Sequence, residues 1–219
     1  MKNLLSSIFN RKTGLQPESF ASIDPKRILF SIPTLSDDIA PLEPLRVRPS
    51  SKDFAFHEDE WSQIEFFPRN KLYTVQQLLK EYKQFELAHR ANRGWSEVYV
   101  RKIQRVPVLS SVDPIAKLEG LLGVKVGPGP ILYTSSEISG RVRNGFSIPL
   151  GGNVTIYGYV DHQDIPVLGA NIGKNPDDLR LTDAFTKIHA SDEVILVDWR
   201  AQLLMIDVDK TSQIEVWRP

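Results

Sequence analysis

Alternating apolar and polar positions predict several strands in this chain, with one long helical pattern between two of them. Trp61–Phe66 and Trp95–Val100 both begin with Trp-Ser and both place apolar residues at alternate positions, which is typical of half-buried strands. The segment between them changes to a helical period. Because a link of this length allows the flanking strands to be parallel, residues 61–103 predict one strand-helix-strand unit.

The helix of this unit has a predicted start and a predicted stop. Thr74 and Gln77 have the spacing of a capping box, in which each side chain bonds the backbone amide of the other residue. Gly94 is expected to end the helical region. The helix would bury a stripe of apolar residues that recur at helical spacing, namely Val75, Leu78, Leu79, Tyr82 and Phe85.

Two shorter helices are predicted farther along the chain. Residues 113–122 have Pro114 at the first helical position, where proline is tolerated, and Gly123 directly after the end. Residues 182–189 fit a third helix, for which Thr182 would provide the N-terminal cap.

The second half of the chain is rich in strand patterns. Predicted strands cover residues 131–133, 141–148, 154–160, 194–197, 203–206 and 214–217. The continuous apolar run Val194–Val197 is typical of a strand that is covered on both faces. We expect the last three strands to form an antiparallel meander in the middle of a sheet.

Before the strand-helix-strand unit the patterns are weaker. Arg27–Ile32 and Phe54–Phe56 predict short strands, and the prolines between them make regular helix improbable. Residues 32–45 are similar to residues 106–121, and residues 165–168 are a shorter match. A true repeat and a coincidence of strand-end residues both stay open.

These elements predict an α+β fold with a mixed, mainly antiparallel sheet and two or three packed helices. Residues 1–26 are polar and turn-rich and are interpreted as a lead-in. The glycine- and proline-rich stretch 123–130 is a boundary between an N-terminal α/β half, residues 27–122, and a β-rich half, residues 130–219. One continuous domain over residues 27–219 is an equal alternative.

Composition narrows the possible functions. The 219 residues include 27 basic and 27 acidic side chains, a balance that argues against sequence-blind nucleic-acid binding. The absence of cysteine excludes thiol catalysis, disulfides and cysteine-bound metals. No apolar run has the length of a membrane span or of a secretory signal, so we expect a cytoplasmic protein that does not enter a membrane.

Known catalytic motifs are missing from the sequence. The stretch 123–130 lacks the Lys-Ser or Lys-Thr pair of a phosphate loop, and no pattern for a bound cofactor or metal is present. Asp161, His162 and Asp164 follow a well-patterned strand and are the candidates for catalysis. They support an alternative function as a hydrolase or a metal-assisted enzyme.

Candidate partner-binding residues come from two patterns. Trp199 and Arg200 fall in the tight turn of the predicted C-terminal hairpin, and Trp and Arg are enriched at interface hot spots. The main basic concentration contributes Arg93, Arg101 and Arg105. The acidic run 57–60 is interpreted as a solvated loop or a docking surface for a basic partner.

Together these observations favour a non-catalytic, cytoplasmic protein-binding module, such as a toxin-neutralising immunity protein or an adaptor, over an enzyme. Its partner would be another protein. A third hypothesis is a structural subunit of a larger assembly. In that case an N-terminal docking arm would use four apolar residues, namely Leu4, Leu5, Ile8 and Phe9.

Overall fold

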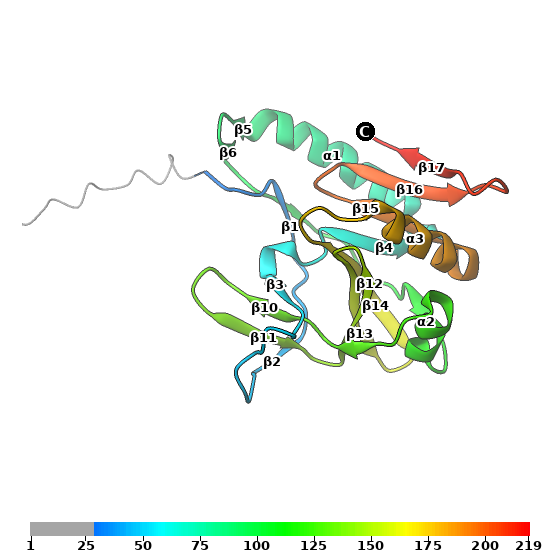
Figure 1. Ribbon diagram of the computed structural model, residues 1–219. Helices are drawn as coiled ribbons and strands as arrows, with labels where there is room; N and C mark the ends of the chain where they lie inside the picture. The colour runs from blue at the N-terminus through cyan, green and yellow to red at the C-terminus, as the bar shows by residue number, and fades with distance from the viewer. Residues whose placement is uncertain (1–28) are drawn as a thin grey trace, which may run out of the picture.

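The computed structural model describes residues 29–219, and its elements form a large sheet with layers on both faces (Figure 1). The predicted lead-in and the proposed docking arm lie outside the described residues. So do Arg27 and Ile28 of the first predicted strand. Of that strand, Phe30 makes only an isolated antiparallel bridge to Trp95.

The large sheet has nine strands, and all of its pairings are antiparallel. In spatial order the main path is β17 (Ile214–Trp217), β16 (Leu203–Val208), β15 (Val194–Asp198), β4 (Ile64–Pro68), β14 (Asp164–Ile172), β13 (Val154–Asp161), β12 (Gly145–Gly151) and β9 (Gly127–Pro128). Strand β8 (Leu109–Ser110) pairs with one end of β14. The sheet therefore combines strands from before and after the stretch 123–130.

Three smaller sheets complete the strand content of the described residues. A four-stranded sheet has the order β2 (Leu42–Glu43), β11 (Ile138–Val142), β10 (Ile131–Tyr133) and β3 (Ala55–His57). A two-stranded parallel ribbon joins β1 (Thr34–Ser36) to β7 (Tyr99–Arg101), and β5 (Arg90–Ala91) forms a hairpin with β6 (Gly94–Trp95). The helices are α1 (Leu72–His89), α2 (Pro114–Leu122) and α3 (Asp178–Asp192), with short 3₁₀ turns η2 (Glu58–Glu60) and η3 (Arg69–Lys71). The α+β fold class with a mainly antiparallel sheet is thus confirmed.

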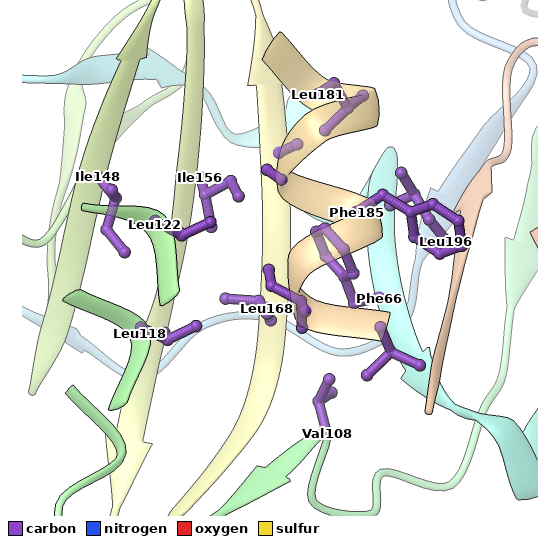
Figure 2. Close-up of a cluster of buried hydrophobic side chains, with 14 of the residues drawn as sticks. Phe66, Val108, Leu118, Leu122, Ile148, Ile156, Leu168, Leu181, Phe185 and Leu196 are labelled. Atoms are coloured by element: carbon purple, nitrogen blue, oxygen red, sulfur yellow. The ribbon is translucent and has the colours of Figure 1, made fainter. Parts of the chain in front are cut away.

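Helices α2 and α3 cover one face of the large sheet and enclose the main apolar core (Figure 2). Leu118 of α2 and Phe185 of α3 are fully buried against strand residues such as Ile156 and Leu168. The ends of α2 show why it forms: Asp113 Oδ1 accepts from the backbone N–H of Ala116 (2.9 Å). The left-handed conformation after the last turn falls on Gly123, as predicted.

The opposite face has two separate apolar clusters. Under α1, Val75, Leu79 and Tyr82 pack on Phe67 and Val197. Farther along the same face, a second cluster lies under the four-stranded sheet and comprises Ala40, Phe56, Trp61, Leu132, Val142, Tyr157 and Val167. Neighbouring residues of β15 contribute to opposite faces, which confirms that its apolar run is buried on both sides.

The strand-helix-strand prediction was correct in element order and wrong in pairing. Strand β7 does not join β4; it pairs with β1 in the separate ribbon, while β4 lies between β14 and β15 in the large sheet. A long link permits parallel pairing of the strands it joins, but contacts elsewhere in the fold choose the partner.

Several predicted boundaries need correction. Helix α1 begins at Leu72 after Lys71, without the predicted Thr74 cap, and it ends at His89, before Gly94. Gly94 instead has φ +125° in the β5–β6 hairpin. In α3 the capping side chain is Asp177, not Thr182.

The predicted strands also differ in detail from those observed. Residues 141–148 belong to two strands, β11 and β12, with a turn at Arg143 and Asn144 between them. The meander β15–β16–β17 forms, but β17 is the edge of the sheet. Residues 32–45 form two short strands, whereas residues 106–121 form a strand and most of a helix.

One close approach explains a glycine in the centre of the sheet. Gly169 of β14 lies opposite Tyr157 of β13, and a Cβ atom at Gly169 would come within 2.6 Å of the tyrosine ring. Glycine therefore leaves room for Tyr157 to lie across the sheet surface.

No helix within the described range is both long and apolar enough to cross a membrane.

Replacing Phe185 with alanine should lower the free energy of unfolding by about 3–5 kcal/mol, because the ring is fully buried between α3 and the sheet. Leu179→Ala on the same helix is the matched control, since Leu179 is 76% exposed. It should change stability by about 0.5 kcal/mol or less. Urea unfolding of both variants checks this, and equal losses would contradict the assigned orientation of α3.

Candidate functional site

The predicted catalytic candidates lie on the exposed turn between β13 and β14. His162 has φ +58°, its side chain is 93% exposed, and its Nδ1 lies 2.9 Å from Asp161 Oδ1. Asp164 instead accepts a hydrogen bond from Ser110 Oγ (2.6 Å). Between residues 29 and 219, no three His, Asp or Glu side chains are grouped so that they could hold a metal ion. An exposed turn of this kind provides no enclosure for a substrate.

Trp199 is buried, which corrects its predicted place on the surface. Its side chain is fully covered, and Nε1 donates a hydrogen bond to Glu65 Oε1 (2.8 Å). The guanidinium of Arg101 lies 4.9 Å above its ring. A buried indole needs an acceptor for its N–H, and Glu65 supplies that acceptor inside the fold.

Arg101, also predicted to bind a partner, points inward as well. It is 2% exposed and donates to Thr34 Oγ1 (2.9 Å) and to the backbone oxygen of Ser62 (2.8 Å). Burial lowers the pKa of Arg101 to about 10, although the nearby Glu65 carboxylate acts in the opposite direction. The guanidinium remains charged at neutral pH and serves to connect β7 to β1 and to the start of β4.

Arg105 joins two carboxylates in the same region. It donates from Nε to Asp38 Oδ2 (2.6 Å) and from Nη1 to Glu65 Oε2 (2.5 Å). Burial by itself would lower the pKa of Arg105, but Glu65 and Asp38 outweigh burial and the pKa is raised. We call Glu65, Arg101, Arg105 and Trp199 the polar seam.

The other two predicted partner-binding arginines lie apart from the seam. Arg93 is exposed in the turn of the β5–β6 hairpin. Arg200, in the turn between β15 and β16, pairs with Glu60 of η2, with Nη1 3.1 Å from Oε1. The five predicted residues therefore do not form one surface, and a role for Arg93 or Arg200 in binding stays a prediction.

A small cavity of about 120 Å³ opens next to the seam, where β1, η2 and β10 meet. Its lining residues, which we call the acidic corner, are Leu35, Ser36, Asp38, Ile39, Glu58, Asp59, Trp61 and Leu132. Asp38 belongs to this lining and also holds Arg105 of the seam. Asp38 therefore links the buried polar seam to a cavity at the protein surface.

The three carboxylates of the acidic corner differ in how they are neutralised. Asp38 has a permanently charged partner, Arg105. Glu58 accepts from the neutral hydroxyl of Ser139 (2.9 Å), and Asp59 lies 3.3 Å from His57 Nδ1. His57 Nδ1 accepts from the backbone N–H of Asp59 (3.2 Å), so within residues 29–219 neither Glu58 nor Asp59 is paired with a lysine or an arginine.

The acidic corner is held from beneath by buried contacts. Trp61 is 4% exposed and packs against Tyr157, with ring centroids 5.0 Å apart. Tyr157 Oη accepts from the backbone N–H of Ser62 (2.9 Å), and Gln63 Nε2 donates to the backbone oxygens of Thr34 and Asp59, both at 2.8 Å. These bonds tie η2 to β1 and β4, so the cavity has fixed walls.

One donor in the corner lacks a partner within the described structure. The Nε1 atom of Trp61 is buried and has no hydrogen-bond acceptor. Buried polar groups are normally paired, and an indole N–H can only donate. Because the atom is fully covered, it is an unsatisfied donor of the fold itself and is closed to a group that enters the cavity.

The lining of the corner contains carboxylates and one hydroxyl. The hydroxyl oxygen of Ser36 accepts from the backbone N–H of Asp38 (3.2 Å) and from Arg105 Nη2 (3.4 Å), an arrangement that does not activate a nucleophile. Carboxylates around apolar walls instead suit a cation with an apolar stem.

Glu65 is the residue of the polar seam that the sequence analysis did not single out. It is 1% exposed, and it interrupts the apolar run Ile64–Phe67. A single charge within such a run is a usable signal, because a buried carboxylate requires cationic or N–H partners elsewhere in the chain. The acidic run 57–60, by contrast, is visible in the sequence, where it is interpreted as a solvated loop or a docking surface for a basic partner.

Replacing Glu65 with glutamine should lower the free energy of unfolding by about 3–5 kcal/mol. The substitution keeps the side-chain shape but leaves Arg101 and Arg105 with less compensating negative charge. Glu215→Gln, on the exposed edge strand β17, is the matched control and should cost about 0.5 kcal/mol or less. A stable Glu65→Gln protein in urea unfolding would contradict the role assigned to the seam.

Stability should fall as the pH rises above about 10, the pKa of an unfolded tyrosine. Burial raises the pKa of Tyr82 and of Tyr99 to about 12, and it also raises the pKa of Tyr157. Below pH ~10 both states keep these protons. Above it the unfolded chain loses them first, so the stability they contribute is lost as pH rises through the folded pKa values.

Phenolate absorbance measured with and without urea checks this expectation, together with urea unfolding at several alkaline pH values. Tyr82→Phe should weaken the pH dependence. Titration of all tyrosines at the same pH in the native and unfolded chains would contradict it.

Comparisons with known proteins give no further guide to this site. No protein-family model matches the sequence, and no match was found among curated proteins or among solved structures. The function proposed for the acidic corner therefore rests on its geometry and its charges.

Proposed function

We propose that this protein is a non-catalytic, cytoplasmic protein-binding module, such as a toxin-neutralising immunity protein or an adaptor, and that it binds its partner through the acidic corner. The observation that carries the proposal is the cavity itself. It combines apolar lining residues with carboxylates. Interfaces use this combination of a small pocket for an anchor residue and a polar rim.

The surroundings of the cavity support a macromolecular partner. Ile39 lines the cavity and is 71% exposed, so an apolar side chain stands at the opening. Glu60 directly follows two of the lining residues in η2, and it pairs with Arg200. A small cavity alone suits a small ligand, but an apolar rim residue gains stabilisation only when a larger surface covers it.

The fixed walls of the corner also support binding. Gln63 and Tyr157 hold η2 and the start of β4 in place, and Arg105 holds Asp38. Binding to a preorganised surface avoids the entropy cost of ordering loops and side chains. The buried polar seam therefore has a consequence for function, because it positions one side of the cavity.

A double substitution, Glu58→Gln with Asp59→Asn, should weaken binding of the native partner by about tenfold or more. Wild-type and variant proteins would be used as affinity baits in lysate from the source cells. The partner captured by the wild type would then be purified and its affinity measured by calorimetry. Both substituted side chains lie at the surface or half-buried, so the urea unfolding midpoint should not change.

Glu215→Gln is the control: it removes a negative charge on β17, outside the acidic corner. It should bind the partner as the wild type does. Equal affinity of the wild type and the Glu58/Asp59 variant for the captured partner would show that the acidic corner is not the binding surface.

A further inference from the structure

We infer that His189 is a pH-dependent latch, which joins the end of helix α3 to the large sheet while its imidazole is protonated and loosens that end when the proton is lost. The inference goes beyond the function proposed for the acidic corner and does not depend on it. It rests on the two acceptors that face the two ring nitrogens, and on the turn that follows the helix.

Each ring nitrogen of His189 faces an oxygen that can only accept a hydrogen bond. Nδ1 lies 2.7 Å from the backbone oxygen of Val194, the first residue of β15. Nε2 lies 3.1 Å from Oδ1 of Asp207 on β16. A neutral imidazole carries one N–H, whereas an imidazolium carries two. Both contacts are therefore hydrogen bonds only while His189 is protonated.

Asp207 is a carboxylate at neutral pH and cannot supply the missing proton. The backbone N–H of Val208 lowers the pKa of Asp207, and the positive charges of Arg69 and of protonated His189 act in the same direction. Arg69 Nη2 lies 3.0 Å from the second carboxylate oxygen, Oδ2. When His189 is neutral and keeps its N–H on Nδ1, a ring lone pair faces Asp207 and the bond to β16 is lost.

The other surroundings of the ring do not replace that bond. The imidazole side chain is 12% exposed and lies against Phe185, with ring centroids 5.4 Å apart. Lys117 of α2 is engaged with Asp192, near the end of α3. Strands β12 and β13 meet α3 with apolar side chains of the main core. Loss of the proton thus leaves a half-enclosed nitrogen beside a carboxylate.

The latch holds a turn that is unfavourable by itself. Glu193 follows the last residue of α3 and has φ +48°, a left-handed conformation that is uncommon for residues other than glycine. Its N–H donates to the backbone oxygen of His189 (2.8 Å), and its own oxygen accepts from the backbone N–H of Arg69 (3.0 Å). His189 joins both sides of this turn. Loss of one of its bonds should let the turn open more often while the core face of α3 stays packed.

Hydrogen exchange of the full-length protein tests the latch at about pH 5.5 and about pH 8.5, on either side of the range in which histidine ordinarily titrates. Protection factors correct for the intrinsic effect of pH on exchange. Those of the Glu193 and Arg69 amides should fall about tenfold at the higher pH, and those in the centre of β13 should change little. Nitrogen-15 NMR of the ring should show N–H at both nitrogens at the lower pH and at Nδ1 alone at the higher pH.

Substitutions separate the latch from a general effect of pH. Asp207→Asn keeps the side-chain shape, and its amide can accept from an imidazolium or donate to a neutral ring, so the fall in protection should disappear. His189→Gln, which does not titrate, should also show equal protection at both pH values. His162→Gln is the matched control, because His162 is exposed in the β13–β14 turn, and it should keep the fall seen in the wild type.

Three results would overturn the inference. The first is equal protection of the Glu193 and Arg69 amides at both pH values in the wild type. The second is a fall in protection that persists in Asp207→Asn or His189→Gln. The third is a His189 ring that keeps one protonation state over the whole range, which the NMR measurement detects even where a variant does not fold.

Discussion

The buried carboxylate of Glu65 is the constraint on which the arrangement of this fold depends. Its two oxygens accept from the indole of Trp199 and from the guanidinium of Arg105. A charge taken out of water at the centre of a sheet needs such partners, and here they come from a hairpin turn and a distant loop. Glu65 therefore fixes how segments far apart in the sequence meet on one face of the large sheet.

The burial of Glu65 and its partners explains why the sequence predicted the location of the partner-binding candidates only in part. Trp199 was proposed as a binding residue from its place in a predicted turn, and Arg101 from its place in the main basic concentration, because arginine is mostly exposed in proteins. Nothing within their own segments shows that a carboxylate on β4 faces them. The relevant signal was the lone glutamate in the run Ile64–Phe67, which indicates that partners must exist without indicating which ones.

Local structure was more accessible to prediction than pairing. The helix at residues 114–122 was predicted with its proline and its terminal glycine, because each of these signals acts within a few residues of the helix end. The burial of β15 was also predicted from a local signal, namely its continuous apolar run. The partner of β7 was not, because alternation shows that a strand has two faces but does not show which strand lies beside it.

The same separation of local and distant information applies to the acidic corner. The run 57–60 shows its negative charge in the sequence, but the cavity exists only because β1, η2 and β10 meet there. Asp38 links the cavity to the buried polar seam. Its carboxylate lines the cavity and also bonds Arg105, which in turn bonds Glu65. A buried interaction that organises the sheet thus also sets one wall of the surface hollow, so stability and binding share residues at this point and should be measured together.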